Sequence, residues 1–333
     1  MSNRGARNFA ARIMPLVCGL TAGVLASAVA LTGYAQNYPN KPVRLIIPYG
    51  PGGTGDVVPR MYADAIGRDL GATFVVENKP GGLAMPAIND VLGNPADGYT
   101  IMASDSGQWA INPAMGTVSG YDFLRDFAPV ARIYANALVL FTSGTNSHGL
   151  KDFIAQEKAK PGTMNYGAAG VGTPHHLIVA VMASRVGTNM QAIQFKSAPE
   201  IATATVNGTV QFSSLGLGGL VAFAKEGRVR LLAVTTKERQ KQIPDVPTVE
   251  ELIGQPFDFP TGQGFVVRAG TPRPIIDRLA ASMRKAAAQP DFYNRIFTIH
   301  GATPVPTTPE DYLEVIRADI KNYADAVKTA GIK

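Results

Sequence analysis

The segment PYGPGGTGD, residues 48–56, is the part of the sequence whose glycine spacing could bind an anion. Gly50, Gly52 and Gly55 follow the Gly-x-Gly-x-x-Gly pattern, between an apolar run, VRLIIP, and a helix-like run, DVVPRMYADAIGRDL. A glycine-rich turn that opens a helix presents free backbone N–H groups and the positive end of the helix dipole. The pattern predicts phosphate binding in a dinucleotide site, binding of another anion, or a turn that only needs glycine backbone angles.

Two features of this segment argue against a bound nucleotide. Pro51 removes a backbone donor from the turn that would wrap the phosphates. The segment also has the Gly-x-x-x-x-Gly spacing of a P-loop, yet Asp56-Val57 stands where Lys-Ser or Lys-Thr is needed, and an aspartate there would repel phosphates. A nucleotide-dependent, Rossmann-like enzyme that uses Gly50-x-Gly52-x-x-Gly55 remains the alternative interpretation.

A second glycine-rich turn, residues 167–172, lies between a strand-like run, Met164 to Tyr166, and a helix-like run, Pro174 to Val186. It repeats the order of strand, turn and helix found in the first segment. Two such turns that face each other would form a clamp for a carboxylate, because each charge-assisted N–H bond contributes about 1.5–3 kcal/mol. A few of these bonds reach about −8 kcal/mol, which is micromolar affinity.

The other reactive side chains indicate neither catalysis nor metal binding. His175 and His176 are helix neighbours about 100° apart and cannot chelate one ion side by side. The single cysteine, Cys18, excludes a disulfide framework and a cysteine zinc site, and no Gly-x-Ser-x-Gly motif is present. The loop SDSGQWAINP, residues 104–113, follows a strand at the edge where α/β sheets bind ligands, so Trp109 is either a pocket wall or a core residue.

The N-terminus has the pattern of a secretory signal peptide. Arg4, Arg7 and Arg12 precede an uncharged stretch from Ile13 to Leu31, and small residues follow up to Ala35. We expect residues 1–35 to be removed on export to the periplasm; the alternative, an uncleaved membrane anchor, is disfavoured by the Gly, Ala, Ser and Thr content of the stretch. These arginines account for half of the formal net charge of +6. No cluster of Lys and Arg interleaved with aromatic residues remains, so no nucleic-acid partner is expected.

The remaining chain alternates short β-branched runs with longer amphipathic runs, which is typical of βαβ units and an α/β fold. In the first amphipathic run, Asp56 to Leu70, apolar residues recur on one helical face. We expect Asp56 to cap this helix and Pro59 to lie in its first turn. A chain of 333 residues exceeds the usual size of one domain, so we expect two lobes.

Several stretches, spread from about residue 37 to the end, match one family in order and spacing. They are YPNKPVRLIIPYGPGGTGD (38–56), VVENKPGG (75–82), ADGYT (96–100), GQWAINP (107–113), DFAPVARI (126–133), KPGTMNYGAAGVGTPHHL (160–177), GRVRLLAVTT (227–236), IPDVPTVEE (243–251), AGTPRPIIDRL (269–279) and GATPVPTTPEDY (301–312). These stretches resemble the Bug-type, TctC-like extracytoplasmic solute receptors of the tripartite tricarboxylate transporter class.

The resemblance implies a two-lobe periplasmic binding protein of type II, a Venus flytrap, in which each lobe is a mixed, mostly parallel sheet flanked by helices. It places lobe 1 at 36–136 plus 262–333 and lobe 2 at 137–261. The crossings are expected near Ile133 to Ala137 and near Pro260 to Gly264, after which the C-terminal portion returns to lobe 1.

The resemblance also implies a ligand carboxylate held by backbone amides and water at the two glycine-rich turns. The candidate ligand-binding residues are Tyr49, Gly52, Gly53, Thr54, Gly55, Ser106, Gln108, Trp109, Ala169, Gly170, Gly172, Thr173 and Phe195. No catalytic residue, cofactor or metal is expected. Many relatives carry an acidic residue after the strand near 210–213, but here no acid precedes Glu226, which favours a carboxylate without an ammonium group.

The implied function is that of a monomeric, exported receptor, not an enzyme. It would capture a small carboxylate in the cleft between the lobes and deliver it to the membrane subunits of a tripartite tricarboxylate-type transporter. The residues alone do not name the carboxylate.

Overall fold

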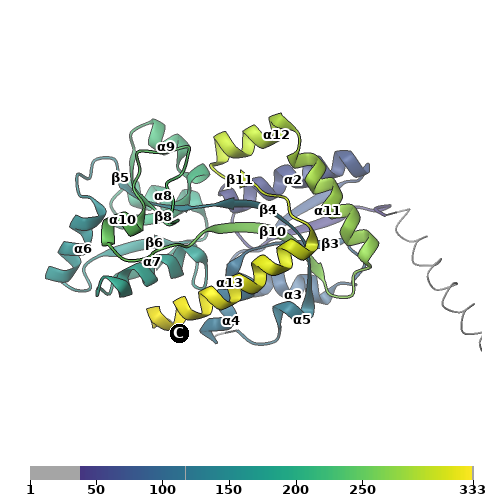
Figure 1. The fold of residues 1–333 in the computed structure, drawn as a ribbon, viewed down its shortest axis with the longest axis horizontal. Coiled ribbons are helices and arrows are strands. Elements are labelled where there is room, and N and C mark those ends of the chain that lie inside the picture. The colour runs from purple at the N-terminus through teal and green to yellow at the C-terminus, as the bar shows by residue number, and fades with distance from the viewer. Residues whose placement is uncertain (1–37, 117, 332–333) are drawn as a thin grey trace, which may run out of the picture.

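The computed structural model describes residues 38–116 and 118–331 and shows an α/β fold of two lobes, each built on a mixed sheet flanked by helices (Figure 1). The predicted signal peptide lies outside the described residues. The first sheet has the order β11-β4-β10-β3-β1-β2 and the second the order β7-β6-β8-β5-β9. In the first sheet the strands are β1 (Val43–Ile47), β2 (Phe74–Asn78), β3 (Thr100–Ser104), β4 (Phe127–Asn136), β10 (Thr261–Arg268) and β11 (Thr303–Pro304). In the second sheet they are β5 (Leu138–Ser143), β6 (Asn165–Ala168), β7 (Gln191–Gln194), β8 (Phe212–Gly216) and β9 (Val229–Val234).

Parallel pairing occupies one half of each sheet instead of dominating it as predicted. Strand β1 pairs in parallel with β2 and β3, and β6 pairs in parallel with β7 and β8. The other pairs are antiparallel, because β4 runs out of the first sheet directly into β5 of the second, and β10 returns beside β4. Figure 1 shows β4 and β10 side by side as they pass between the sheets. The lobe boundaries themselves stay a prediction.

The helices flank both sheets and follow the predicted order with additions. They are α2 (Thr54–Leu70), α3 (Met85–Gly93), α4 (Asn112–Met115), α5 (Phe123–Asp126), α6 (Leu150–Ala159), α7 (Pro174–Arg185), α8 (Ala198–Val206), α9 (Val221–Lys225), α10 (Val249–Ile253), α11 (Arg273–Ala287), α12 (Pro290–Asn294) and α13 (Pro309–Ala330). Helix α8 is absent from the sequence-based prediction, because its sequence, APEIATATV, mixes β-branched residues into a short segment. Within the described part of the chain, none of the helices has the length and apolar character needed to cross a membrane.

Asp56 does not cap α2 as predicted. The helix begins two residues earlier, at Thr54, with Gly53 as its N-cap, and Pro59 therefore lies inside the helix. Asp56 is buried in the first turn, where its carboxylate accepts hydrogen bonds from the Gly52 N–H (3.0 Å), Asn78 Nδ2 (2.8 Å) and Arg60 Nε (2.9 Å). It holds the glycine-rich turn to the helix and to the end of β2.

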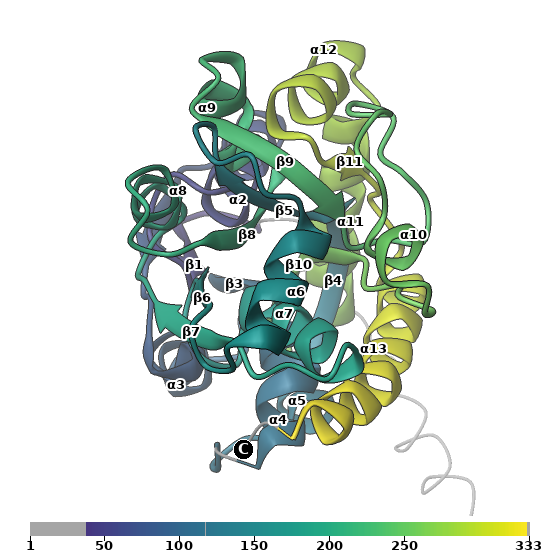
Figure 2. The same ribbon diagram turned by 90° about the vertical axis from the view of Figure 1, so that its left-hand side faces the viewer.

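Helix α13 joins the two lobes instead of returning only to the first. It packs on β4 and on the turn Gly107–Ile111 of the first lobe and on α7 of the second. Figure 2 shows α13 running beside α7 toward α4 and α5. Tyr323 donates to the Pro260 carbonyl (3.3 Å), and Ser184 of α7 donates to the Thr329 carbonyl (3.0 Å). One apolar core accordingly contains Trp109 and Leu177 from different lobes.

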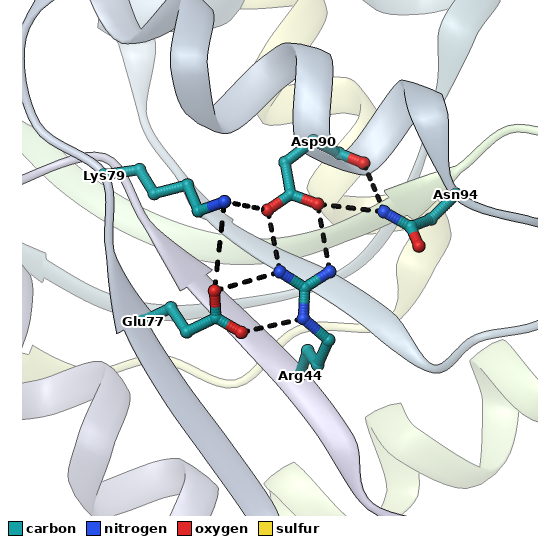
Figure 3. A network of polar contacts seen from close by, with 5 residues as sticks. All are labelled: Arg44, Glu77, Lys79, Asp90 and Asn94. Atoms are coloured by element: carbon teal, nitrogen blue, oxygen red, sulfur yellow. Dashed lines mark hydrogen bonds and ion pairs between the residues drawn. The ribbon is translucent and has the colours of Figure 1, made fainter.

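A charged network fixes the edge of the first sheet (Figure 3). The Arg44 guanidinium on β1 makes paired hydrogen bonds with Glu77 of β2 (2.7 and 2.9 Å) and with Asp90 of α3 (2.9 and 2.8 Å). Lys79 binds both carboxylates, and Asn94 Nδ2 donates to Asp90 Oδ1 (2.9 Å). The arginine holds the pKa of Asp90 down, to about 2, and lowers that of Glu77. The network thereby positions the connection between β2 and α3, residues 79–84.

Replacing Arg44 with Met should lower the free energy of unfolding by about 1–2 kcal/mol at pH 7, between the values typical of exposed and of buried ion pairs. The folded-state pKa of Asp90, about 2, lies below its ordinary value of 3.8, so this stabilisation is present above that value and is lost as the pH falls. Urea unfolding at pH 7 and near pH 2.5 measures the difference between the two proteins.

The matched control is Lys41→Met, which removes an exposed pair with Asp97 (3.2 Å) and should change stability by less than about 1 kcal/mol. An Arg44→Met loss that stays constant from pH 7 to pH 2.5 would show that the arginine stabilises through packing and not through its carboxylate partners.

Candidate functional site

A small, partly open cavity lies between the two sheets and is walled by both lobes. Its volume is about 60 Å³, enough for several waters, each of which needs at least about 10–15 Å³, or for a small organic acid. The first lobe contributes the turn after β1 and the start of α2, and the second contributes the starts of α7 and α8 and the end of β8. Asn136 and Thr261, on the strands that pass between the sheets, complete the wall and are joined by a hydrogen bond of 2.7 Å.

Helices α2, α7 and α8 all begin at this cavity. Gly53, Thr54 and Gly55 line it from α2, Pro174 and His175 from α7, and Ser197 and Ala198 from α8. The first N–H groups of a helix have no partner within the helix, and each helix start carries roughly half a positive charge. The cavity wall is therefore rich in free N–H groups and positive dipole ends, although proline supplies no donor at Pro174.

Two buried side-chain atoms in the wall have no hydrogen-bond partner within the described residues. They are Thr54 Oγ1 and His175 Nδ1. Burial lowers the pKa of His175 to about 4, so its ring is neutral at pH 7. Because an unpaired buried polar atom costs about 1–3 kcal/mol, these atoms indicate a partner supplied by a ligand or by bound water.

An acidic residue, Asp105, also lines this cavity, beside Tyr49. The Tyr49 hydroxyl donates to Asp105 Oδ2 (2.5 Å), and the Gly107 N–H donates to Oδ1 (2.8 Å). Burial raises the pKa of Asp105 to about 6 despite these bonds. Asp105 follows β3 directly, at the strand end where α/β sheets bind ligands.

A second, larger cavity of about 290 Å³ shares Tyr49 and Ala169 with the lining of the first. Its wall consists of the turn Gly81–Ala84 and the second glycine-rich turn, Ala169–Thr173. Leu83 and Ala84 have positive φ angles of 57° and 66°, a conformation that costs a residue with a side chain about 1–3 kcal/mol. Asn112 Nδ2 donates to the Leu83 carbonyl (2.8 Å) and so secures this strained turn.

The lobes approach each other so closely at these turns that glycine is required. A Cβ on Gly50 would lie 2.5 Å from the Lys196 carbonyl oxygen, and a Cβ on Gly172 would lie 1.9 Å from Asn112 Oδ1, across the boundary between the lobes. Gly172 also has a positive φ of 71°. These glycines therefore permit contact between the lobes in addition to any contact with a ligand.

The structure brings most of the predicted binding residues to the two cavities. Tyr49, Gly53, Thr54, Gly55 and Ala169 line the first cavity, and Gln108, Gly170, Gly172 and Thr173 line the second. Thr173 also caps α7, because its hydroxyl accepts from the His176 N–H.

Four predicted residues lie outside both linings. Gly52 is exposed, and its N–H donates to Asp56. Trp109 is a core residue: its ring contacts Phe123 and Tyr312, and its Nε1 donates to Asp319 (3.1 Å). Ser106 is buried close to the Tyr323 hydroxyl, and Phe195 packs on the core of the second lobe.

Sequence reasoning missed the acid, the third helix start and the two cavity residues on the strands that pass between the sheets, Asn136 and Thr261. In the sequence, Asp105 is part of the polar loop 104–113, and the lack of an acid between the strand near 210–213 and Glu226 favours a ligand without an ammonium group. In the structure, Asp105 lines the cavity and supplies an acid from another segment. Ser197 and Ala198 were missed with helix α8. The signal that could have found them is Ser197-x-Pro199, a residue favoured at helix N-caps followed by proline in the first turn.

The geometry of the first turn does not suit a dinucleotide. The buried carboxylate of Asp56 already binds the Gly52 N–H, and Gly50 packs against the second lobe. A carboxylate at this place would repel phosphates. Among the described residues, no group of three or more His, Cys, Asp or Glu side chains is arranged to hold a metal ion.

Comparison with known proteins gives a consistent picture. A family model described as "Tripartite tricarboxylate transporter family receptor" matches residues 58–332. The protein BugT of Bordetella pertussis is 30% identical over 314 residues, which cover 93% of this chain and 95% of BugT.

Solved structures of similar proteins share the fold. The R. palustris protein Rpa4515 with adipate has a TM-score of 0.85 and 26% identity, over 89% of this chain and 99% of that chain. The periplasmic binding protein BugD has a TM-score of 0.82 and 25% identity over the same shares. The chain therefore belongs to the tripartite tricarboxylate transporter receptor family, whose members are solute-binding receptors.

Proposed function

We propose that the protein is an exported periplasmic receptor that captures a small carboxylate in the first cavity. It delivers this ligand, as a monomer and without catalysis, to the membrane subunits of a tripartite tricarboxylate transporter. The observation that carries the proposal is the meeting of the α2, α7 and α8 starts at one cavity, next to the buried Thr54 Oγ1, which has no hydrogen-bond partner within the described residues.

The cavity wall supplies the interactions that a carboxylate needs. Each helix start contributes about 0.3–2 kcal/mol to an anion, and each charge-assisted N–H bond about 1.5–3 kcal/mol. Lys196 lines the cavity with an exposed side chain and adds a cation near its mouth. Asp56 does not cancel these terms, because Arg60 and Asn78 bind its carboxylate.

The relatives support this ligand class. Rpa4515 has been solved with adipate, a dicarboxylate, and it shares 26% identity and a TM-score of 0.85 with this chain. The family description names receptors of a tricarboxylate transporter, which supports delivery to membrane subunits. BugD is a periplasmic binding protein, which supports the compartment expected from the N-terminal residues.

Calorimetric titration of the purified, mature protein distinguishes this proposal from the alternative interpretation, a nucleotide-dependent enzyme. NAD, ATP, adipate and a panel of mono-, di- and tricarboxylates are the probes. We expect saturable binding of at least one acid and none of either nucleotide. Binding of NAD or ATP without binding of any acid would overturn the receptor proposal.

Replacing Thr54 with Val should weaken carboxylate binding about 10-fold or more. The change removes Oγ1 and keeps the side-chain shape. A hydrogen bond to a charged group contributes about 1.5–3 kcal/mol, and a loss of about 1.4 kcal/mol of binding free energy weakens affinity tenfold. Stability should not fall, because Oγ1 has no partner within the described residues. The measurement is calorimetric affinity for the tightest-binding acid of the panel, together with thermal unfolding.

Thr54→Ser is the matched control, because it keeps the hydroxyl and should retain affinity within about threefold. Equal affinity of the wild type and Thr54→Val would show that Oγ1 does not contact the ligand.

Replacing Gly172 with Val should reduce affinity by at least about 100-fold, because the new side chain would collide with Asn112 and keep the lobes apart. Gly187→Val is the matched control: Gly187 has the same φ of 71°, but a Cβ there would meet nothing within 4 Å. Gly187→Val should lose about 1–3 kcal/mol of stability through the positive φ, and Gly172→Val should lose at least as much, because the collision is added to the same backbone strain. Affinity and thermal unfolding separate the two effects, and equal loss of affinity in both variants would contradict a contact between the lobes at Gly172.

A further inference from the structure

Asp105 is the buried acid of the first cavity that has no cationic partner. The residue is 6% exposed, it lines the cavity, and it takes part in no ion pair within the described residues. Its carboxylate accepts hydrogen bonds from the Tyr49 hydroxyl and the Gly107 N–H, which are neutral donors. The Gln108 side chain, which is also neutral, lowers the pKa of Asp105 somewhat and so favours the ionised carboxylate.

Asp56, the other acid of the same wall, is different. Arg60 and Asn78 bind its Oδ1, and the Gly52 N–H binds its Oδ2, so its charge is balanced within the protein. Each oxygen of an ionised carboxylate has two lone pairs. Asp105 accepts a hydrogen bond from Gly107 on Oδ1 and one from Tyr49 on Oδ2, and even with the Gln108 side chain beside it the carboxylate has fewer donors than lone pairs. It therefore keeps acceptor capacity at the cavity.

The other groups near Asp105 do not supply a counter-charge. His175 lines the same cavity but is neutral at pH 7, because burial lowers its pKa to about 4. Tyr134 is a neutral phenol whose hydroxyl donates to Gln263 (3.2 Å), and Asp319 adds a second negative charge beyond the cavity wall. Lys196 lines the cavity from the opposite lobe, with its side chain exposed.

A ligand held only by its carboxylate would place a negative group in a small cavity with an unpaired negative side chain. The arrangement is favourable when the ligand also carries a donor that reaches Asp105. A buried carboxylate gains most from a charged or strongly polar donor, because hydrogen bonds that involve an ionised group are about twice as strong as neutral ones.

We propose that Asp105 determines specificity by accepting a hydrogen bond from an ammonium or hydroxyl group of the bound carboxylate. The ligand class is thus a small amino or hydroxy acid, whose carboxylate lies at the helix starts of α2, α7 and α8 and whose donor faces Asp105. This inference rests on the proposed receptor function and narrows its ligand.

The test compares acids that differ only in the donor. The probes are propionate, lactate and alanine; succinate, malate and aspartate; and glutarate, 2-hydroxyglutarate and glutamate, each titrated calorimetrically into the mature protein at pH 7.5. In at least one series, the hydroxy or amino acid should bind at least 10-fold more tightly than the unsubstituted acid. Comparison of the hydroxy acid with the amino acid in that series shows whether Asp105 prefers a hydroxyl or an ammonium donor.

The variant Asp105→Asn should reduce this preference for the hydroxy or amino acid to less than about threefold. Asp319→Asn is the matched control, because Asp319 is also an acid whose pKa burial raises to about 6, yet it does not line the cavity. It should keep the preference, so a loss in both variants would indicate a general charge effect and overturn the assignment to Asp105.

The wild-type result decides the inference even if Asp105→Asn fails to fold. Unsubstituted acids that bind as tightly as their hydroxy and amino partners in every series would overturn the role of Asp105 and leave the carboxylate receptor intact. Failure of every acid, adipate and the tricarboxylates included, would overturn the receptor proposal itself.

Discussion

The close approach of the two lobes is the constraint on which the site depends. The N–H groups at a helix start bind a ligand well only where another part of the chain keeps water away from them. Here the helix starts of each lobe face the other lobe across the cavity. That approach leaves room for no side chain at Gly50 and Gly172, which face Lys196 and Asn112 of the opposite lobe. The glycines thus serve two purposes: they free the backbone to meet a ligand, and they let the lobes meet each other.

The electrostatics of the cavity follow from the same geometry. The helix starts bring positive dipole ends to the wall, which contains no arginine; these dipole ends suit a carboxylate but do not discriminate among carboxylates. Selectivity then has to come from the few side chains that reach the cavity. The charge of Asp56 is balanced by Arg60, and its carboxylate holds the turn in place. Asp105 accepts hydrogen bonds only from neutral donors, so its charge is available to a ligand in the cavity.

Several connections hold the lobes in this relation. The strands β4 and β10 pass side by side between the sheets, and Asn136 and Thr261 join them at the cavity wall. Helix α13 spans the boundary and shares an apolar core with Trp109 and α7. The Arg44 network secures the edge strand and the strained turn before α3, whose Leu83 approaches Gly172 across the boundary. The cavity is therefore supported from the strands that pass between the sheets, from the C-terminal helix and from the sheet edge.

The sequence by itself determined the local elements and both glycine-rich turns. The α/β alternation predicted the fold class and the helix that follows each glycine-rich turn, because hydrophobic periodicity and helix boundaries are local signals. It also placed Tyr49, Thr54 and Gly170 among the cavity residues. Only the tertiary structure decided that Trp109 is a core residue and that residues 198–206 form a helix. It also decided that Asp56 is a buried side chain that links the turn to β2 and does not cap the helix, and that Asp105 lines the cavity. The physical reason is that burial, charge balance and packing depend on residues far apart in the chain, and no pattern within a short window of sequence records which of them meet.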